Sequence, residues 1–459
     1  MLQNPRRALN PRRALLLSML AALGAAAALS AEPALAQTTG GTALAERLPA
    51  LVDAKAPAAI EVRHHLHQNP ELSNREVETG KRVAAELRAL GFEEVRTGVA
   101  HHGVVGVLRG GRPGPVVAVR ADMDALPVTE QTDFPFKSTV RAEYQGQEVG
   151  VAHACGHDIH TSVQLGVAAM LAEMREELPG TVIFVFQPAE EGVPPGEEGG
   201  APLMLEEGVF GDLRPAAMFA LHTQPLLDAG KLEIAPGPIM AAADRFHVTI
   251  RGKQSHGAYP HLGVDPVVTA AQAILALQTI SSRTVPPIAP SVVSVGIVRG
   301  GERFNIIPGE VYLEGTVRTY GGEVQDTIEK RMGEILAGVT QAAGASFEHQ
   351  YVRVTPATVN DAALTERVRE SLAAAVGPAN VGEGEPTMGA EDFAFFANEV
   401  PSVYFWLGVR EPGGQSGGLH TPDYRAVDGA VPVGMRAMSR VLIDFLSGGE
   451  AAPVARPGA

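Results

Sequence analysis

Several short apolar segments in the sequence are typical of β-strands that are buried on both faces. They are residues 104–110 (VVGVLRG), 115–122 (PVVAVRAD), 181–187 (TVIFVFQ), 216–222 (AAMFALH) and 402–408 (SVYFWLG). They lack the polar–apolar alternation of a strand with one face in water. Segments with apolar residues at helical spacing lie among them, including residues 75–90 and 161–178. The fold class we predict is therefore α/β, with a layered α/β/α domain.

The order of predicted elements changes between residues 241 and 353. A strand at 245–252, a helix at 265–282, strands at 291–298 and 310–318, a helix at 324–343 and a strand at 346–354 follow one another. This βαββαβ order is that of a ferredoxin-like unit. We therefore predict a smaller domain at 241–353, inserted into a larger domain made of residues 45–240 and 354–448, with a disordered tail at 449–459.

The N-terminus resembles a cleavable secretory signal. Arginines precede an apolar run from Ala14 to Leu29, which is shorter than a membrane span, and Ala34-Leu35-Ala36 offers a cleavage site. We expect residues 1–36 to be removed and the mature protein to be periplasmic or secreted. The arginine pairs leave open whether export follows the general or the twin-arginine route, and an uncleaved anchor is the alternative.

Charge narrows the range of partners. Removal of residues 1–36 takes away four arginines and one glutamate, which changes the formal net charge from -15 to -18. Such an acidic chain is not expected to bind nucleic acid, and no membrane association is expected after cleavage. A small-molecule partner is the remaining expectation.

Cys155 is the single cysteine of the 459 residues. It cannot form an intramolecular disulfide, although exported proteins usually keep cysteines for that purpose. Burial as a small apolar residue is one interpretation. The neighbouring histidines in AHACGHDIH favour another, a metal-binding thiolate.

Potential metal ligands follow the predicted strands, at the end of a sheet where α/β proteins place their sites. The set comprises Asp122 and Asp124, Cys155 and His157, Glu190 and Glu191, His222, and His420 in a later loop. Thiolate, imidazole and carboxylate together suit zinc, manganese, cobalt or nickel better than calcium. In the Glu190-Glu191 pair one carboxylate can bind metal while the other faces the water to be activated.

Nine segments in order resemble a family of metal-dependent amidohydrolases and peptidases. They are RHHLHQNPELSNREVETG, RADMDALPV, HACGHDIHTS, QPAEEG, LHTQP, GKQSHGAYPHLGVDP, FNIIPGEVYLEGTVR, MGAEDFAFF and LHTPDY. The family includes aminoacylases, carboxypeptidase G, hippurate hydrolases and plant auxin-conjugate hydrolases, and the last two form the most similar branch. The resemblance implies a di-metal aminopeptidase-like catalytic domain whose inserted domain serves as a lid and dimerisation domain.

The resemblance also implies roles for individual residues. The ligands of two divalent metal ions would be Cys155, His157, Glu191, His222 and His420, with Cys155 as the bridge. Glu190 would be the general base. Asp122 stands where other branches have a metal-binding histidine, which weakens it as a ligand, and Asp124 would orient a metal-bound imidazole.

The inserted domain is expected to contribute three further residues. His256 resembles the family histidine that enters the active site of the partner subunit, which implies a homodimer. Asn305 resembles its companion, and Arg318 suits capture of a substrate carboxylate, although a surface strand arginine is the plain alternative. We assign no role to His153, His160 and His261.

The resulting hypothesis is hydrolysis of N-acyl amino acids, with aromatic acyl groups such as those of hippurate-like, indole-acyl or ochratoxin-like conjugates. A dipeptidase or carboxypeptidase of the same family is the first alternative. A periplasmic binding protein is a second, because it also combines a signal, two α/β lobes and an acidic charge. The acyl group, the native metal and the oligomeric state are not fixed by the sequence.

Overall fold

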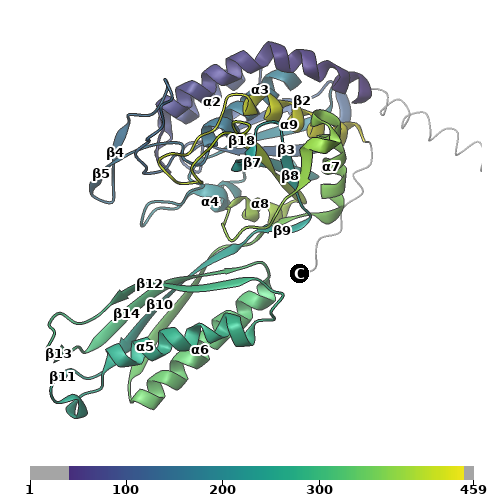
Figure 1. The fold of residues 1–459 in the computed structure, drawn as a ribbon. Helices are drawn as coiled ribbons and strands as arrows, with labels where there is room; N and C mark the ends of the chain where they lie inside the picture. Colours follow the sequence, from purple (N-terminus) through teal and green to yellow (C-terminus); the bar gives the residue numbers. More distant parts are fainter. Residues whose placement is uncertain (1–40, 449–459) are drawn as a thin grey trace, which may run out of the picture.

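An eight-stranded sheet forms the centre of the larger domain in the computed structural model, which describes residues 41–448 (Figure 1). Its strands lie in the order β1 (Glu94–Val99), β2 (Gly103–Arg109), β6 (Pro179–Gln187), β3 (Arg112–Asp122), β7 (Ala217–Asp228), β18 (Ser402–Arg410), β8 (Leu232–Ile234) and β17 (Val381–Glu383). β3 runs parallel to β6 and β7, and β7 runs parallel to β18. Parallel neighbours end at the same edge, so the residues that follow β3 and β6 lie close to the end of β7.

Helices cover both faces of this sheet. One face packs against the helical residues 41–68 and against α2 (Val77–Ala89), α3 (His157–Glu173), α7 (Ala362–Val376) and α9 (Ala430–Ser447). The other face packs against α4 (Gly200–Glu206) and α8 (Phe393–Glu399). Consecutive β3 residues divide between the two sides: Val117 and Val119 join the first core, and Ala118 joins the second. The predicted α/β/α fold class is confirmed.

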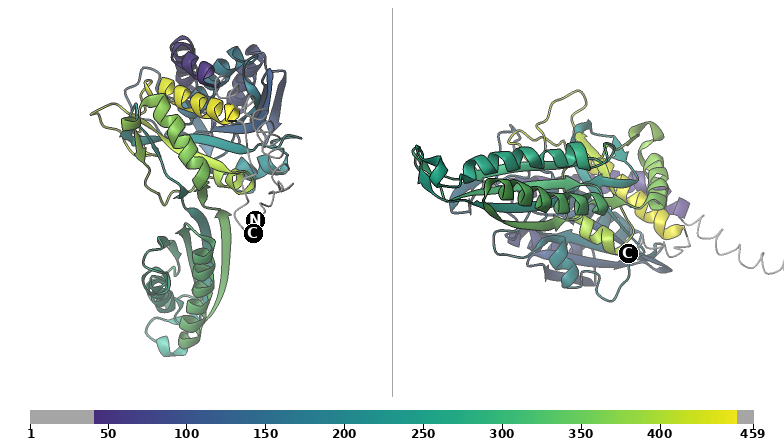
Figure 2. Two further views of the ribbon diagram at one scale, coloured as in Figure 1. Left: turned by 90° about the vertical axis from the view of Figure 1, so that its right-hand side faces the viewer. Right: turned by 90° about the horizontal axis from the view of Figure 1, so that it is seen from below.

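The smaller domain is an antiparallel sheet with two helices on one face (Figures 1 and 2). Its strands β10 (Ala242–Arg251), β12 (Ser291–Arg299), β14 (Glu310–Thr319) and β15 (Ser346–Thr355) lie in the order β12-β14-β10-β15. The helices α5 (Pro266–Leu277) and α6 (Gly322–Ala343) complete the βαββαβ order, as predicted. Phe246, Val248 and Ile250 alternate along β10 toward these helices and are fully buried.

Figure 1 shows that the smaller domain extends away from the larger one, joined through the long strands at its base. The chain passes between the domains next to a short pair of strands, β9 (Gly237–Met240) and β16 (Thr358–Asn360). At the far end of the smaller domain lies a second short pair, β11 (Ser255–His256) and β13 (Ile306–Ile307).

Some features differ from the sequence-based expectation. The helix predicted to reach residue 282 ends at Leu277, and a π-helical turn covers Ile280–Thr284. The hairpin of β4 (Arg141–Tyr144) and β5 (Gln147–Gly150) was not predicted. Within residues 41–448 no helix is both long and apolar enough to cross a membrane. The predicted signal at 1–36 and the predicted tail at 449–459 lie outside the described residues.

Candidate metal centre

The potential ligands meet at the carboxyl ends of the central parallel strands. Asp122 is the last residue of β3, the Glu190-Glu191 pair follows β6, and His222 lies within β7. Cys155 and His157 flank the start of α3, and a backbone hydrogen bond of 2.8 Å from His420 to the carbonyl of Ala154 holds the His420 loop beside them. Chain segments far apart in sequence are thus brought together at one edge of the sheet.

Cys155, His157 and His222 form a first set of three, with one ligand atom of each lying within 4.8 Å of the others. The Sγ of Cys155 lies 3.3 Å from Nε2 of His222. The other ring nitrogen of His222, Nδ1, donates to the carbonyl of Thr223 at 2.8 Å, so Nε2 is the nitrogen with a free lone pair. This is the tautomer that a metal ligand requires.

Cys155 also belongs to a second set, with Glu191 and His420. Nε2 of His420 lies 3.3 Å from Oε1 of Glu191. That oxygen of Glu191 and Nε2 of His157 are buried, and neither has a hydrogen-bond partner in the part of the chain that the structure describes. Unsatisfied buried polar atoms are costly, and a cation would satisfy both. The two sets share the Cys155 sulfur, so the residues present fit two divalent ions with a bridging thiolate.

Asp124 orients two of these ligands. Its Oδ1 lies 3.2 Å from Nδ1 of His157, which leaves Nε2 of that ring free. Its Oδ2 accepts hydrogen bonds from the backbone N–H of Glu191 at 3.0 Å and from Ser73 Oγ at 2.7 Å. These are the contacts that a residue orienting a metal-bound imidazole would make, and that role of Asp124 stays a prediction.

Carboxylates dominate the electrostatics of the centre. Burial acts to lower the pKa of His157, but Asp122, Asp124 and Glu191 outweigh it and raise this pKa to about 10. Burial and the surrounding carboxylates raise the pKa of the Cys155 thiol well above its ordinary value. Both groups therefore hold protons that divalent cations would displace.

Glu190 lies next to the ligand sets, with Oε2 at 4.0 Å from Nε2 of His157. Its Oε1 accepts a weak hydrogen bond of 3.4 Å from the backbone N–H of Asp392. Burial, followed by the charges of Glu391 and Glu191, raises the pKa of Glu190 well above its ordinary value. A carboxyl group with a raised pKa beside a metal centre is suited to accept and return a proton.

A fully buried arginine, Arg120, binds several of the acidic residues next to the metal-ligand sets. Arg120 on β3 donates to Asp122 at 2.6 Å, to Glu391 at 2.8 Å and to Asp392 at 3.2 Å. Gln187 connects the same group, since it accepts from Arg120 at 2.8 Å and donates to Asp392 at 2.6 Å. The acids thus have partners that make their burial tolerable.

Asp122 and His160 are occupied by structural hydrogen bonds. His160 Nε2 accepts the backbone N–H of Thr223 at 2.9 Å, so its Nδ1 carries the proton that is shared with Asp122 at 2.5 Å. Both ring nitrogens of His160 are thereby used. His160 therefore links β7 to β3. Asp122 is held by Arg120 and His160, and its Oδ2 lies 3.7 Å from Nε2 of His157.

Backbone conformation at the site is unusual. Gly156, between Cys155 and His157, has φ 87°, and a Cβ there would lie 2.4 Å from the Tyr424 hydroxyl. Ala189, before the glutamate pair, and His420 have φ of 54° and 63°. Non-glycine residues rarely adopt such angles, and their occurrence at functional sites is common.

The lid residues are not brought to this centre within one chain. His256 on β11 is exposed, and it pairs with Ile306 of β13 in the short ladder at the far end of the smaller domain (Figure 1). The carbonyl of Asn305 accepts a hydrogen bond from the backbone N–H of Gly257 at 2.8 Å. Its side-chain Oδ1 is buried and has no hydrogen-bond partner among the described residues. Arg318 on β14 is half-buried, and no carboxylate among residues 41–448 lies within ion-pair distance of it.

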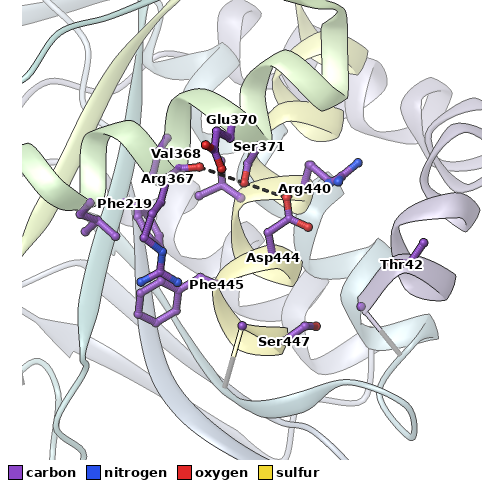
Figure 3. Close-up of a pocket in the computed structure, with 14 residues that line it drawn as sticks. Thr42, Phe219, Arg367, Val368, Glu370, Ser371, Arg440, Asp444, Phe445 and Ser447 are labelled. Atoms are coloured by element: carbon purple, nitrogen blue, oxygen red, sulfur yellow. Dashed lines mark hydrogen bonds and ion pairs between the residues drawn. The ribbon is translucent and has the colours of Figure 1, made fainter. Parts of the chain in front are cut away.

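A separate cavity of about 530 Å³ lies between α7 and α9 (Figure 3). Asp444, one of its lining residues, accepts hydrogen bonds of 2.7 Å from both Ser371 and Arg440. No residue of the metal-ligand sets lines it. It is distinct from the candidate centre.

Sequence reasoning missed the network around Arg120. The signal was available, because an arginine inside the apolar segment VVAVRAD requires buried partners. Those partners, Glu391 and Asp392, lie some 270 residues later, just before α8. Nothing local in the sequence connects them to β3.

The fold and the site together define a metal-dependent hydrolase with a dinuclear centre. The model of peptidase family M20/M25/M40 matches residues 118–444, and the chain belongs to this family. It is an enzyme of the kind that hydrolyses amide bonds, as the resemblance predicted, and two divalent metal ions are the cofactors that the site supports. A periplasmic binding protein is thereby set aside.

Three characterised relatives illustrate the range of the family. The chain is 38% identical to an N-acetylcysteine deacetylase of Bacillus subtilis, over 76% of this chain and 88% of the relative. It is 39% identical to thermostable carboxypeptidase 2 of Saccharolobus solfataricus, over 76% and 86%. It is 35% identical to an IAA-amino acid hydrolase of Arabidopsis thaliana, over 84% and 85%.

A solved structure agrees with the fold and the metal count. It is a dinuclear metal binding peptidase of the same family from Bacillus subtilis, with a TM-score of 0.72 and 32% identity. The similarity covers 86% of this chain and 99% of that one.

Proposed function

We propose that this protein hydrolyses the amide bond of N-acyl amino acids, with aromatic acyl groups of the hippurate-like, indole-acyl or ochratoxin-like kind. The observation that carries the proposal is the pair of ligand sets that share Cys155, with Glu190 beside them. Relatives named for N-acetylcysteine and for IAA-amino acids support the substrate class.

The residues present divide the reaction between them. Bound divalent ions would supply Lewis acidity, which polarises the carbonyl and lowers the pKa of water from ~15.7 toward ~7. Glu190 accepts the proton of the attacking water and returns it to the leaving nitrogen. Asp124 holds His157 and the backbone of Glu191 in place during this transfer.

The proposed mechanism needs a second copy of the chain. His256 of the partner subunit would donate to the developing oxyanion, and Asn305 would accompany it. A face for such a copy exists, because α5 exposes Val268 (55%) and Leu275 (73%), and β12 is the free edge of its sheet. Arg318, which has no ion-pair partner in the described range 41–448, would bind the substrate carboxylate.

Export and metal identity belong to the same proposal. A signal at residues 1–36 would deliver the enzyme to the periplasm or the medium. Among metals, zinc fits the mixed thiolate, imidazole and carboxylate set best, with manganese, cobalt and nickel as alternatives.

The test is a substrate panel with a general-base variant. Purified protein loaded separately with zinc, manganese and cobalt is expected to hydrolyse N-benzoyl and indole-acyl amino acids. Glu190→Gln should keep its metal content while kcat falls by ~10²-fold or more. Glu206→Gln, an exposed position on α4, is the control. Near-normal turnover by Glu190→Gln would contradict the assignment.

A peptidase is the second candidate, and the identity to a thermostable carboxypeptidase favours it. The two candidates differ in the substrate's amino end. Faster cleavage of dipeptides with a free amino terminus than of their N-acyl counterparts would select the peptidase.

A further inference from the structure

A cavity of about 700 Å³ borders the candidate metal centre, with Glu191 in its wall. A volume of this size is ordinary for a pocket that takes a drug-sized molecule. Four chain segments form the wall, and its residues are Leu72, Ser73, Arg75, Ala125, Leu126, Pro127, Glu143, Tyr144, Gln145, Glu191, Gly192, Pro194 and Pro195. A substrate bound at the metals can therefore extend one end into this cavity.

The tip of the β4–β5 hairpin forms one side of the cavity, and Tyr144 is its aromatic residue. The hairpin closes through Gln145 and Gly146, whose φ of 52° and 77° are those of a type I′ turn. Figure 1 shows the hairpin standing out from the edge of the larger domain. Tyr144 is 37% exposed, so its ring is accessible to a ligand.

The base of the hairpin is fixed to the body of the domain. Val151, directly after β5, packs with Leu72 and Ala125 in a small core that also takes in Val140 and Ala142. Ala152 forms a β-bridge with Leu126. Three residues of this support, Leu72, Ala125 and Leu126, also line the cavity. The hairpin therefore holds Tyr144 at a defined place.

The charges of the cavity select which end of a substrate fits. Arg75 is its one cation, and Glu197 binds the guanidinium of Arg75 at 2.6 and 3.0 Å. Glu143 adds a negative charge to the wall, while leucine and proline side chains supply apolar surface. A carboxylate would be repelled here, whereas Arg318 in the lid has no ion-pair partner within residues 41–448. The uncharged acyl end of the substrate therefore fits this cavity better than its carboxylate end.

We propose that this cavity is the acyl-group subsite and that Tyr144 determines specificity for aromatic acyl groups by packing against their rings. This rests on the proposed function, since it assumes an N-acyl amino acid as substrate. Aromatic side chains favour offset or edge-to-face contact with another ring. The hairpin thus supplies a contact that a small acyl group cannot reach.

The experiment compares two substrate series in the metal-loaded enzyme. One series varies the acyl group of a single amino acid (acetyl, benzoyl, indole-3-acetyl), and the other varies the amino acid of a benzoyl substrate. Tyr144→Ala should raise KM about tenfold for benzoyl and indole-acyl substrates and leave acetyl substrates within about twofold. Tyr144→Phe should restore the wild-type KM, because the ring is retained. Glu148→Ala, on the same hairpin but outside the cavity wall, is the matched control.

A binding measurement separates recognition from turnover. Calorimetry with benzoate, the acid that hydrolysis would release, should give a Kd about tenfold weaker in Tyr144→Ala than in Tyr144→Phe. A KM change that follows the amino acid instead of the acyl group, or equal effects on acetyl and benzoyl substrates, would overturn the subsite. Absence of N-acyl amino acid hydrolysis in the wild-type enzyme would overturn the proposed function, and the subsite with it.

Discussion

Asp124 shows how single residues prepare this centre. It accepts hydrogen bonds from the backbone of Glu191 and from Ser73, and it bonds to Nδ1 of His157. These contacts hold the His157 imidazole and the backbone of Glu191 in place without the help of a metal ion. A positioning residue of this kind contributes to metal affinity without touching the metal.

Asp124→Asn should therefore weaken metal binding by 10- to 100-fold, the usual effect of losing such a partner. Ser73→Ala is the graded control, because it leaves the carboxylate and its bond to His157 in place, and its effect should be smaller. Competition titration against a chelator measures both. An unchanged Kd in Asp124→Asn would show that His157 needs no orienting acid.

Helix α3 is tied to the helical residues 41–68 by buried charge. Asp158 in the first turn of α3 binds Arg63 at 3.2 Å and His67 at 3.0 Å, and His67 also bonds to Glu130 at 3.1 Å. Burial acts to lower the pKa of His67, but the bonds to Asp158 and Glu130 outweigh it and raise this pKa to about 9. This cluster holds the element that carries His157.

A pH-dependent contribution to stability follows. Because the pKa of His67 is higher in the folded state than its ordinary value of about 6.5, its stabilisation is complete below about pH 6.5 and disappears as the pH rises through about 9. The contribution is on the order of 3 kcal/mol or less. In metal-free protein, the difference in Tm between wild type and His67→Gln should shrink across that interval. His261→Gln, at an exposed lid position, should show no such trend. A Tm difference for His67→Gln that stays constant from pH 6 to pH 9.5 would contradict this account.

Helices and strands could be predicted where the signal lies within a few neighbouring residues of the sequence. Strands that are buried on both faces could be predicted from apolar segments without alternation. The polar residues that follow these strands could then be placed at one edge of the sheet. The β4–β5 hairpin was not predicted because RAEYQGQEVG is mostly polar and its alternating part, RAEY, is very short. The partners of Arg120 could not be predicted because they lie in a loop that is far away in the sequence.

At the scale of the whole molecule, the short strands β11 and β13 of the smaller domain lie apart from the candidate metal centre of the larger domain. His256 lies on β11, which is at the far end of the smaller domain (Figure 1), whereas Glu190 follows β6 of the larger domain. The sequence could suggest this histidine by resemblance but could not give its distance. The proposed active site, completed by two copies of the chain, would reconcile this position of His256 with the role that the resemblance implies.

Mixing of inactive variants tests this arrangement. Glu190→Gln and His256→Ala should each be inactive, and a hybrid dimer of the two should regain activity because one of its sites has both groups intact. Glu190→Gln mixed with Cys155→Ala is the control, since both changes then fall in the centre of their own chain and every site is damaged. If the first mixture stays inactive after exchange of subunits, His256 does not act in trans.

The central claim is that one thiolate joins two metal sites, and metal counting tests it most directly. Elemental analysis of the metal-loaded wild-type enzyme is predicted to find about two ions per chain, as the two ligand sets that share Cys155 require. Cys155→Ala, with an unchanged metal-free Tm, should lose at least one of them, whereas His261→Ala should lose none. A Cys155→Ala protein that retains both ions with wild-type affinity would contradict the account and leave Cys155 as an ordinary buried residue.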